Sequence, residues 1–475
     1  MKQLLKTRNI DIALAAIVVV VLSFALLGAK ALAVSLCLLL AYSIPIAIFR
    51  RMDCYSVIGQ VALSFAFVAM SVFFLLNYWQ STVLLGTADV PYLLYDAQTF
   101  YLLSHDLYNN TLGVHSPITP YMGYPIFLSW WLHCGIEDIA YPVIVNILLL
   151  LCTMLLVARC CGFIMSSDVD VQRVSGYAML LLAMVPGVMG MATLLAKEPF
   201  IIFALVACVC AMYAIRQRCN VLLYSLLLLL GLVILASMRT TYLYVLLLFV
   251  AGIWLYKFRP TDLLSGVLVV CAIGVAIYVG SMQSWWQDSA FVGRYVEPGK
   301  RVTFFCGDSQ EPLQRLIGPY YLYPLWLRFV LLPVTVAVQF IIPFPFETAV
   351  QQLGHPISMT VYHRMSYLWY LAAIPMLGYY LFYWWRKGGV RMSLFAIVAA
   401  AAYCIPAYMT AGSVSRYAFC FVPFLAILGG YVMWRILDNR DELKRLGVFA
   451  MIYAIVVSAA LFIGANPYVL YALIK

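Results

Sequence analysis

The chain has 475 residues, of which 65% are hydrophobic and 10% are charged. Soluble proteins carry about 25% charged residues, so this composition excludes a soluble globular enzyme, a disordered chain and a nucleic-acid-binding domain. The net charge of +10 lies mostly in short loops between apolar runs. It therefore indicates membrane topology, and no nucleic-acid partner is expected.

Apolar runs that are long enough to cross a bilayer recur from Asp11 to the C-terminus. A transmembrane helix needs about 20 such residues, so the pattern predicts an all-α, polytopic transmembrane bundle of about 13 spans. The expected spans cover 11–29, 31–49, 57–77, 139–158, 174–192, 199–215, 220–237, 241–256, 262–281, 366–385, 392–409, 417–434 and 447–464.

The lengths of the loops divide this bundle into four expected parts. These are two N-terminal spans (1–56), a core with an acidic outer loop at 78–138 (57–281), a second long outer loop (282–365) and the C-terminal spans (366–475). The second loop includes an apolar stretch at 326–345 that contains Pro333, Pro343 and Pro345. Proline breaks helices, so this stretch is predicted to be re-entrant or interfacial.

Positive residues predict the orientation of the chain, because they collect on the cytoplasmic side of membrane proteins. With the N-terminus inside, the inner segments hold Lys2, Lys6, Arg8, Arg50, Arg51, Arg159, Arg173, Arg216, Arg218, Lys257, Arg259, Arg386, Lys387, Arg391, Arg435, Arg440, Lys444 and Arg445. Both long loops are then extracytoplasmic. The expected location is the cell membrane, taken as a bacterial inner membrane.

The first outer loop contains acidic residues and no Lys or Arg. A carboxylate at the outer face of the membrane suits a general base, because it can accept the proton of a hydroxyl in a site drier than bulk water. Asp96 is the first candidate and Asp89 the second. The alternative is that Asp96 only caps a helix that starts near Ala97.

Several motifs stand near the expected outer ends of spans. They read Y-D-A-x-x-F-Y at 95–101, G-Y-P-x-F-L at 123–128, A-K-E-P at 196–199, and S-R-Y at 415–417 followed by Pro423. Their order resembles that in GT-C fold glycosyltransferases, multi-pass enzymes similar to protein O-mannosyltransferases and lipid A aminoarabinose transferases. Three features depart from the family pattern: two extra spans precede the acidic loop, Ala97 stands where a second acidic residue is common, and Lys-Glu at 197–198 stands where an Asp is commoner.

The resemblance implies a glycosyltransferase that acts outside the cytoplasm on a sugar carried by a polyprenyl phosphate or pyrophosphate. The acceptor would be a glycan, a lipid or a protein. Arg and Lys at the outer face can stabilise the negative charge that develops on the departing phosphate, Arg by a bidentate contact. The expected phosphate-binding residues are Arg416, Arg239, Lys197 and Arg301, and the expected substrate-binding residues are Glu198, Tyr101, Tyr124 and Tyr417. The alternative for these cations is a side chain that snorkels to lipid phosphate.

No metal ligand is predicted, because the five histidines are scattered and lack a metal-binding spacing. Cofactors are left open, with a divalent cation as one option. Two other functions fit the sequence. The Lys-Glu pair at 197–198 also resembles a step in bacterial polysaccharide polymerases, so a polymerase or ligase of O-antigen or capsule type is the first. A lipid or glycolipid transporter is the second, although no internal repeat is visible.

Overall fold

The computed structural model describes residues 10–79, 97–112, 122–165, 169–255, 260–281, 375–376, 378–380, 395–399, 402, 419–437 and 439–465. Its elements within these ranges are all helical, as predicted. They are α2 (Ile10–Leu27), η1 (Gly28–Lys30), α3 (Ala31–Phe49), α4 (Val57–Trp79), α5 (Ala97–Tyr108), α6 (Gly123–His133), α7 (Ala140–Ile164), α8 (Val171–Ala183), α9 (Pro186–Ala192), α10 (Glu198–Arg216), α11 (Val221–Met238), α12 (Thr241–Leu255), α13 (Pro260–Ser281), α21 (Val422–Leu437) and α22 (Arg440–Ala465).

The described helices are those of an integral membrane protein. Six of them, α2, α3, α4, α7, α10 and α11, are long and apolar enough to cross a bilayer, and the bent pair α8–α9 gives up to seven such spans among the described residues. The expected count of about 13 depends in part on residues outside this set. The stretch 282–374, which contains the second outer loop and the predicted re-entrant segment 326–345, lies outside it, as does 403–418.

The expected span 174–192 is interrupted, which corrects the prediction of one continuous helix. The chain bends by 68° between α8 and α9. Pro186 is the first residue of α9, and the backbone of Val185 is extended. Proline has no N–H to donate and disfavours helical conformation in the preceding residue, so the sequence Val185-Pro186 ends one helix and begins another.

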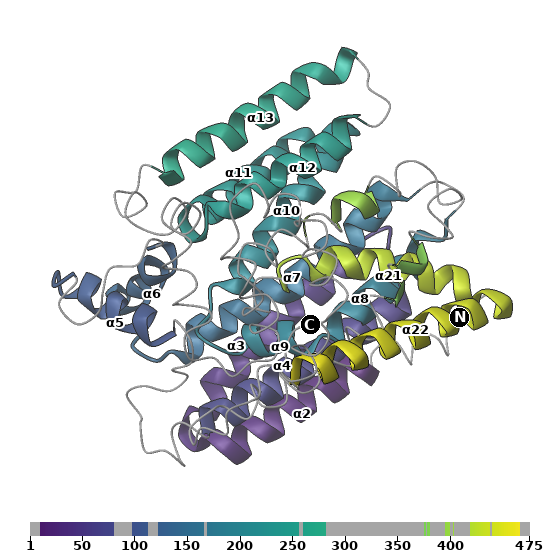
Figure 1. The fold of residues 1–475 in the computed structure, drawn as a ribbon. Coiled ribbons are helices and arrows are strands. Elements are labelled where there is room, and N and C mark those ends of the chain that lie inside the picture. The colour runs from purple at the N-terminus through teal and green to yellow at the C-terminus, as the bar shows by residue number, and fades with distance from the viewer. Residues whose placement is uncertain are drawn as a thin grey trace.

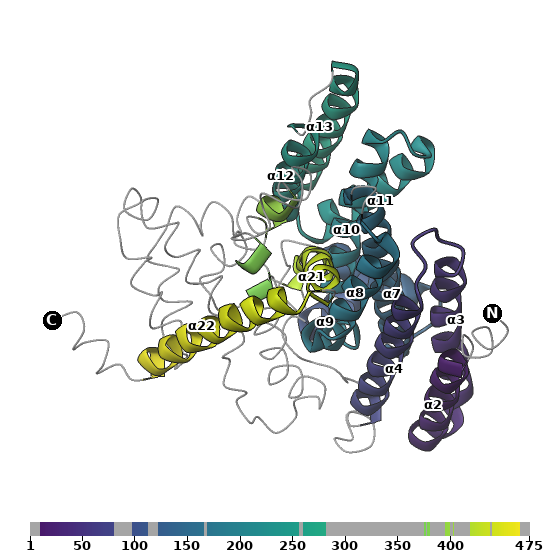
Figure 2. The ribbon, with the colours of Figure 1, turned by 90° about the vertical axis from the view of Figure 1, so that its right-hand side faces the viewer.

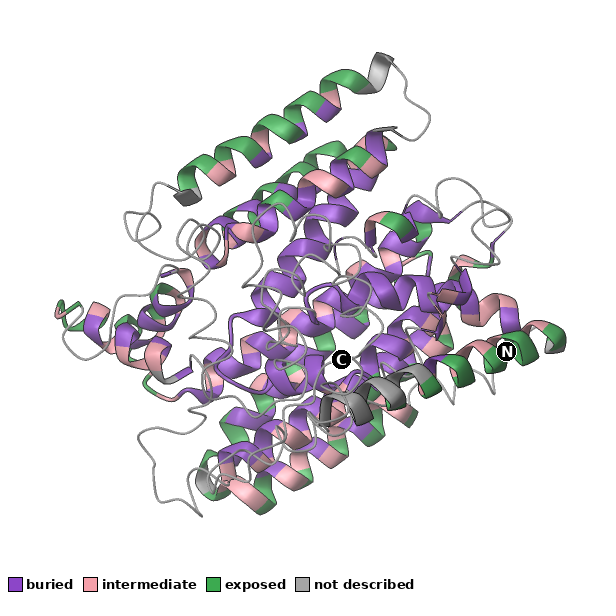
Figure 3. Ribbon diagram, in the orientation of Figure 1, coloured by how far each residue is buried: buried purple, intermediate pink, exposed green. Residues whose placement is uncertain are grey.

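The centre of the bundle is α10, in which Glu198 to Ala214 are all buried. A helix that is apolar all round is expected to be enclosed by its neighbours, and α10 packs against α7 and α11. Figure 3 shows the buried residues concentrated in these central helices, and Figure 2 shows α2 and α13 on opposite flanks. The flanking helices expose Leu14, Phe24 and Leu268, which suits contact with lipid.

Small residues let the central helices approach closely. A Cβ added to Gly231 of α11 would lie 2.5 Å from Cys208 Sγ on α10, and one added to Gly430 of α21 would lie 2.7 Å from Ala178 N on α8. No side chain fits in either gap, since a real Cβ needs more than 3 Å. This is the close packing of small residues that membrane helices use in place of a hydrophobic driving force.

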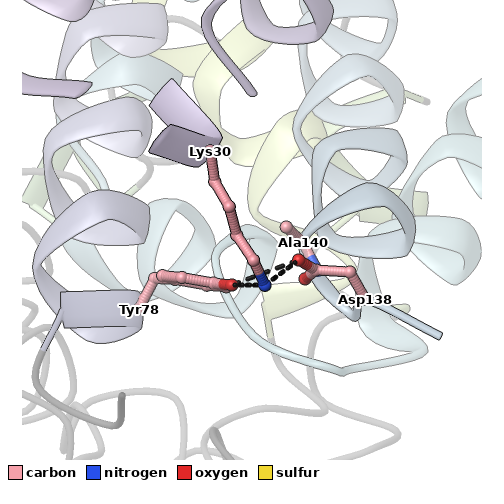
Figure 4. Close-up of polar contacts among 4 residues, drawn as sticks. All are labelled: Lys30, Tyr78, Asp138 and Ala140. Carbon is pink, nitrogen blue, oxygen red and sulfur yellow. Dashed lines mark hydrogen bonds and ion pairs between the residues drawn. The ribbon is translucent and has the colours of Figure 1, made fainter. Parts of the chain in front are cut away.

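At one end of the bundle, the turn between α2 and α3 is joined to the core by an ion pair. Lys30 Nζ lies 2.9 Å from Asp138 Oδ2 and 3.1 Å from the hydroxyl of Tyr78 at the end of α4 (Figure 4). Asp138 Oδ1 also accepts the backbone N–H of Ala140 at the start of α7. The hydrogen bond from Lys30 to Asp138 is the main reason why the pKa of Lys30 is raised.

The other end of the bundle carries a second set of polar contacts. Arg159 of α7 lies 3.6 Å from Asp53 and donates a hydrogen bond to Tyr224 at the start of α11. Gln172 and Gln217 donate to the carbonyls of Asp53 and Phe163. These contacts bring together the ends of α3, α7 and α10 and the starts of α8 and α11. The described loops between these helices, which the positive residues predict to share one side of the membrane, therefore lie together.

We expect the first end to face outward, because the basic residues near Arg159 are more numerous than those near Lys30. Single cysteines at Asn110 and Arg173, in a chain without native cysteines, would test this in intact cells. An impermeant maleimide should label Asn110→Cys directly and Arg173→Cys only after permeabilisation. The opposite pattern would invert the topology.

Candidate functional site

The candidate site lies at the end of the bundle that carries Lys30, around a non-helical segment between α9 and α10. Residues 193–197 leave the helical path while remaining buried. Non-helical backbone at membrane depth is tolerated only where other groups satisfy its carbonyls and N–H groups. The described structure supplies such a group from Asn146 of α7, while Asn77 of α4 donates to the side-chain hydroxyl of Thr193.

Asn146 is fully buried and binds the segment directly. Its Nδ2 donates to the carbonyl of Leu194 at 2.8 Å and lies 3.2 Å from that of Ala196. The same nitrogen lies 3.4 Å from the hydroxyl of Tyr124. Its Oδ1 is buried and has no hydrogen-bond partner among the residues described. Asn77 supports the beginning of the segment by donating to Thr193 Oγ1 at 3.2 Å.

Tyr124 joins the segment to the two short helices α5 and α6. It is fully buried, and its ring lies 5.5 Å from that of Phe100 on α5 and 5.9 Å from that of Phe200 on α10. Offset and edge contacts of this kind stabilise aromatic clusters beyond their buried area. Burial raises the pKa of the Tyr124 phenol, so the group stays protonated at neutral pH.

Lys197 and Glu198 stand where the segment enters α10. Their exposed fractions are only 7% and 3%. The Lys197 ammonium lies 4.8 Å from the centre of the Phe100 ring, a cation–π contact. Glu198 occupies the first turn of α10, where the helix dipole favours negative charge. The site therefore holds a buried cation and a buried carboxylate side by side in the sequence.

Arg239 approaches the same site from the end of α11. The chain is extended at Arg239, whose N–H donates to the carbonyl of Leu235. Its guanidinium lies 5.9 Å from the ring of Tyr242. The Tyr242 ring in turn lies 5.7 Å from that of Phe421, the residue directly before α21. α10 and α11 are consecutive helices packed against each other, so the start of α10 and the end of α11 lie at this same end of the bundle.

Four of the residues predicted from the sequence, Lys197, Glu198, Tyr124 and Arg239, thus lie at this end of the bundle. Tyr101 is on α5, and its ring contacts His105 at 4.5 Å. Asp89, Asp96, Arg301, Arg416 and Tyr417 lie outside the described residues. Two of these are close in sequence to the site: Asp96 is bonded to Ala97, the buried first residue of α5, and Arg416 precedes buried Phe419 by three residues.

The sequence interpretation missed Asn146 and Phe100 as parts of the site. Asn146 is a single amide inside an apolar span, where it is followed by I-L-L-L-L. A polar residue inside a span usually has a partner. That signal was available. Phe100 belongs to the Y-D-A-x-x-F-Y motif at 95–101, but nothing in the sequence indicated that its ring would contact the ammonium group of Lys197. Among the described residues, no group of three His, Cys, Asp or Glu side chains could hold a metal ion.

Comparison with known proteins gives a distant structural similarity. No protein-family model and no curated protein sequence matches the chain. The structure is similar to the oligosaccharyltransferase of Archaeoglobus fulgidus in complex with zinc and sulfate, with 14% identity and a TM-score of 0.45, over 85% of this chain and 52% of that one. It is also similar to archaeal AglB from the same organism in complex with an inhibitory peptide and a dolichol-phosphate, with 13% identity and a TM-score of 0.44, over 85% and 55%. The chain spans about half the length of these proteins, and at this level of similarity the function has to be argued from the residues of the chain itself.

The role of Asn146 can be tested by stability. Asn146→Leu removes the donor to two buried carbonyls, and leaving such groups unsatisfied costs about 1–3 kcal/mol each. We expect a clear fall in the melting temperature in detergent. Thr153→Val is the matched control, because Thr153 lies on the same helix and bonds only to the carbonyl of Leu149. Equal melting temperatures for both variants would mean that Asn146 does not hold the segment.

Proposed function

We propose that the protein is a membrane glycosyltransferase that transfers a sugar from a polyprenyl-linked phosphate or pyrophosphate donor to a glycan, lipid or protein acceptor outside the cytoplasm. One observation carries this proposal. Lys197–Glu198 and Arg239, which come from separate motifs, meet at one end of the bundle. Helix α5, which begins one residue after Asp96, contacts Lys197 there through Phe100, and Phe421, five residues after Arg416, contacts Tyr242 beside Arg239.

The charges at this end suit a lipid-linked phosphate. A polyprenyl phosphate places its phosphate at headgroup level and its tail among the spans. Lys197 and Arg239 supply positive charge where apolar helices end, and cations aimed at a departing phosphate stabilise the charge that develops on it. Being buried, Lys197 would act with little screening by water.

Asp96 is the proposed general base. It precedes α5 directly, and Phe100, one turn further along that helix, contacts Lys197. A carboxylate there would accept the proton of the acceptor hydroxyl while the sugar is bound by neighbouring groups. Glu198, Tyr101, Tyr124 and Tyr417 are the proposed sugar contacts.

Asp96→Asn tests the base. The amide keeps the shape of the side chain but cannot take a proton, so transfer should fall at least about a hundredfold while donor binding persists. The assay is transfer of label from a polyprenyl-linked sugar by purified protein in nanodiscs. Asp89→Asn is the control and should have a milder effect. Turnover near wild type in both variants would remove the acidic loop from the chemistry.

Arg239→Ala tests the phosphate contact. Loss of one charge-assisted hydrogen bond is worth about 1.5–3 kcal/mol, so donor affinity should fall by roughly tenfold to a hundredfold. Arg239→Lys should recover part of it, because Lys lacks the guanidinium fork. Arg173→Ala, at the opposite end of the bundle, should bind donor normally. Unchanged donor affinity in Arg239→Ala would place this residue among ordinary interfacial anchors, and Arg416→Ala would then be the decisive variant.

A further inference from the structure

Helix α6 has two unlike faces and no charged residue. Tyr124, Leu128 and Leu132 on one face are buried. The opposite face presents Ile126, which is 49% exposed, and Trp130, which is 73% exposed. A large apolar face that is open to its surroundings calls for a partner.

The position of α6 is fixed by close contact with the end of α11. A Cβ added to Gly123 would lie 2.7 Å from the carbonyl oxygen of Ser237, so only glycine allows the two backbones to approach this closely. α6 therefore begins where α11 ends. Figure 1 shows α5 and α6 beside this end of α11.

The exposed face of α11 leads directly to this contact. Leu222, Leu226, Leu229 and Val233 are exposed along it at helical spacing, and Ser237 is one turn further. α11 has 18 residues, which is about 27 Å at 1.5 Å per residue, close to the hydrocarbon thickness of about 30 Å. Ser237 lies about 24 Å along the helix from Val221, which places it near the boundary between hydrocarbon and headgroups.

We infer that α6 lies in the headgroup layer of the bilayer, with Ile126 and Trp130 in contact with phospholipid. Three features point to this partner: α6 begins against Ser237, one turn beyond the exposed apolar stripe of α11, it contains no Asp, Glu, Lys or Arg, and tryptophan is enriched at membrane interfaces. The buried face of the same helix carries Tyr124, so the candidate site lies at headgroup depth. The inference concerns membrane depth and does not rest on the proposed function.

Depth can be measured by spin labelling in nanodiscs. Nitroxides would be placed at Ile126→Cys and Trp130→Cys, with Val233→Cys as the hydrocarbon reference and Asn110→Cys as the aqueous reference. The depth of each nitroxide is given by the ratio of its accessibility to oxygen to its accessibility to a nickel chelate. This ratio at positions 126 and 130 should lie between those of the two references. A value at Trp130→Cys equal to that at Asn110→Cys would overturn the inference and favour an aqueous partner, such as a glycan that stacks on the ring.

A second measurement uses the wild-type chain, so it does not depend on the folding of cysteine variants. A phospholipid with a diazirine in its acyl chain near the headgroup is incorporated into the nanodisc and activated by light. Adducts mapped by mass spectrometry should occur in 123–133 as well as in 222–233. Adducts in 222–233 with none in 123–133 would contradict the placement of α6 in the membrane.

Discussion

The backbone leaves the helical path at Thr193 and resumes it at Glu198 inside the buried part of the protein, and the candidate site depends on that interruption. Unsatisfied peptide groups are costly there, because no lipid can bond to them. Asn146 donates to two carbonyls of this segment, and Asn77, from a second helix, donates to the hydroxyl of Thr193. As a result Lys197 and Glu198 are presented at the start of a helix that is otherwise enclosed by apolar residues.

Each of three cations at this end of the bundle lies beside a described partner. Lys30 is paired with Asp138, Lys197 lies on the ring of Phe100, and Arg239 lies near that of Tyr242. Lys30 is thereby part of the attachment of the N-terminal helices to the core. Lys197 is buried and Arg239 stands at the end of a span, positions where positive charge is retained only with local stabilisation.

Helix α6 connects the site to its surroundings. On one face, Tyr124 contacts Asn146 and Phe100. On the other face, Ile126 and Trp130 are exposed. Because Gly123 is pressed against Ser237, a shift of this helix would move both faces together.

The sequence by itself determined the class of the protein, the ends of most described spans and the relative sides of their loops, because apolar length and the placement of Arg and Lys are local properties. It also identified Lys197, Glu198, Tyr124 and Arg239 as residues of interest. The break between α8 and α9 also has a local cause, Pro186, although the 68° bend is seen only in the structure. The tertiary structure alone decided that Asn146 bonds to the 193–197 segment and that Lys197 lies on the ring of Phe100. A hydropathy pattern indicates which segments lie in the membrane and which lie outside it. It does not report how helices are arranged around one another, because lipid-facing and helix-facing residues are equally apolar.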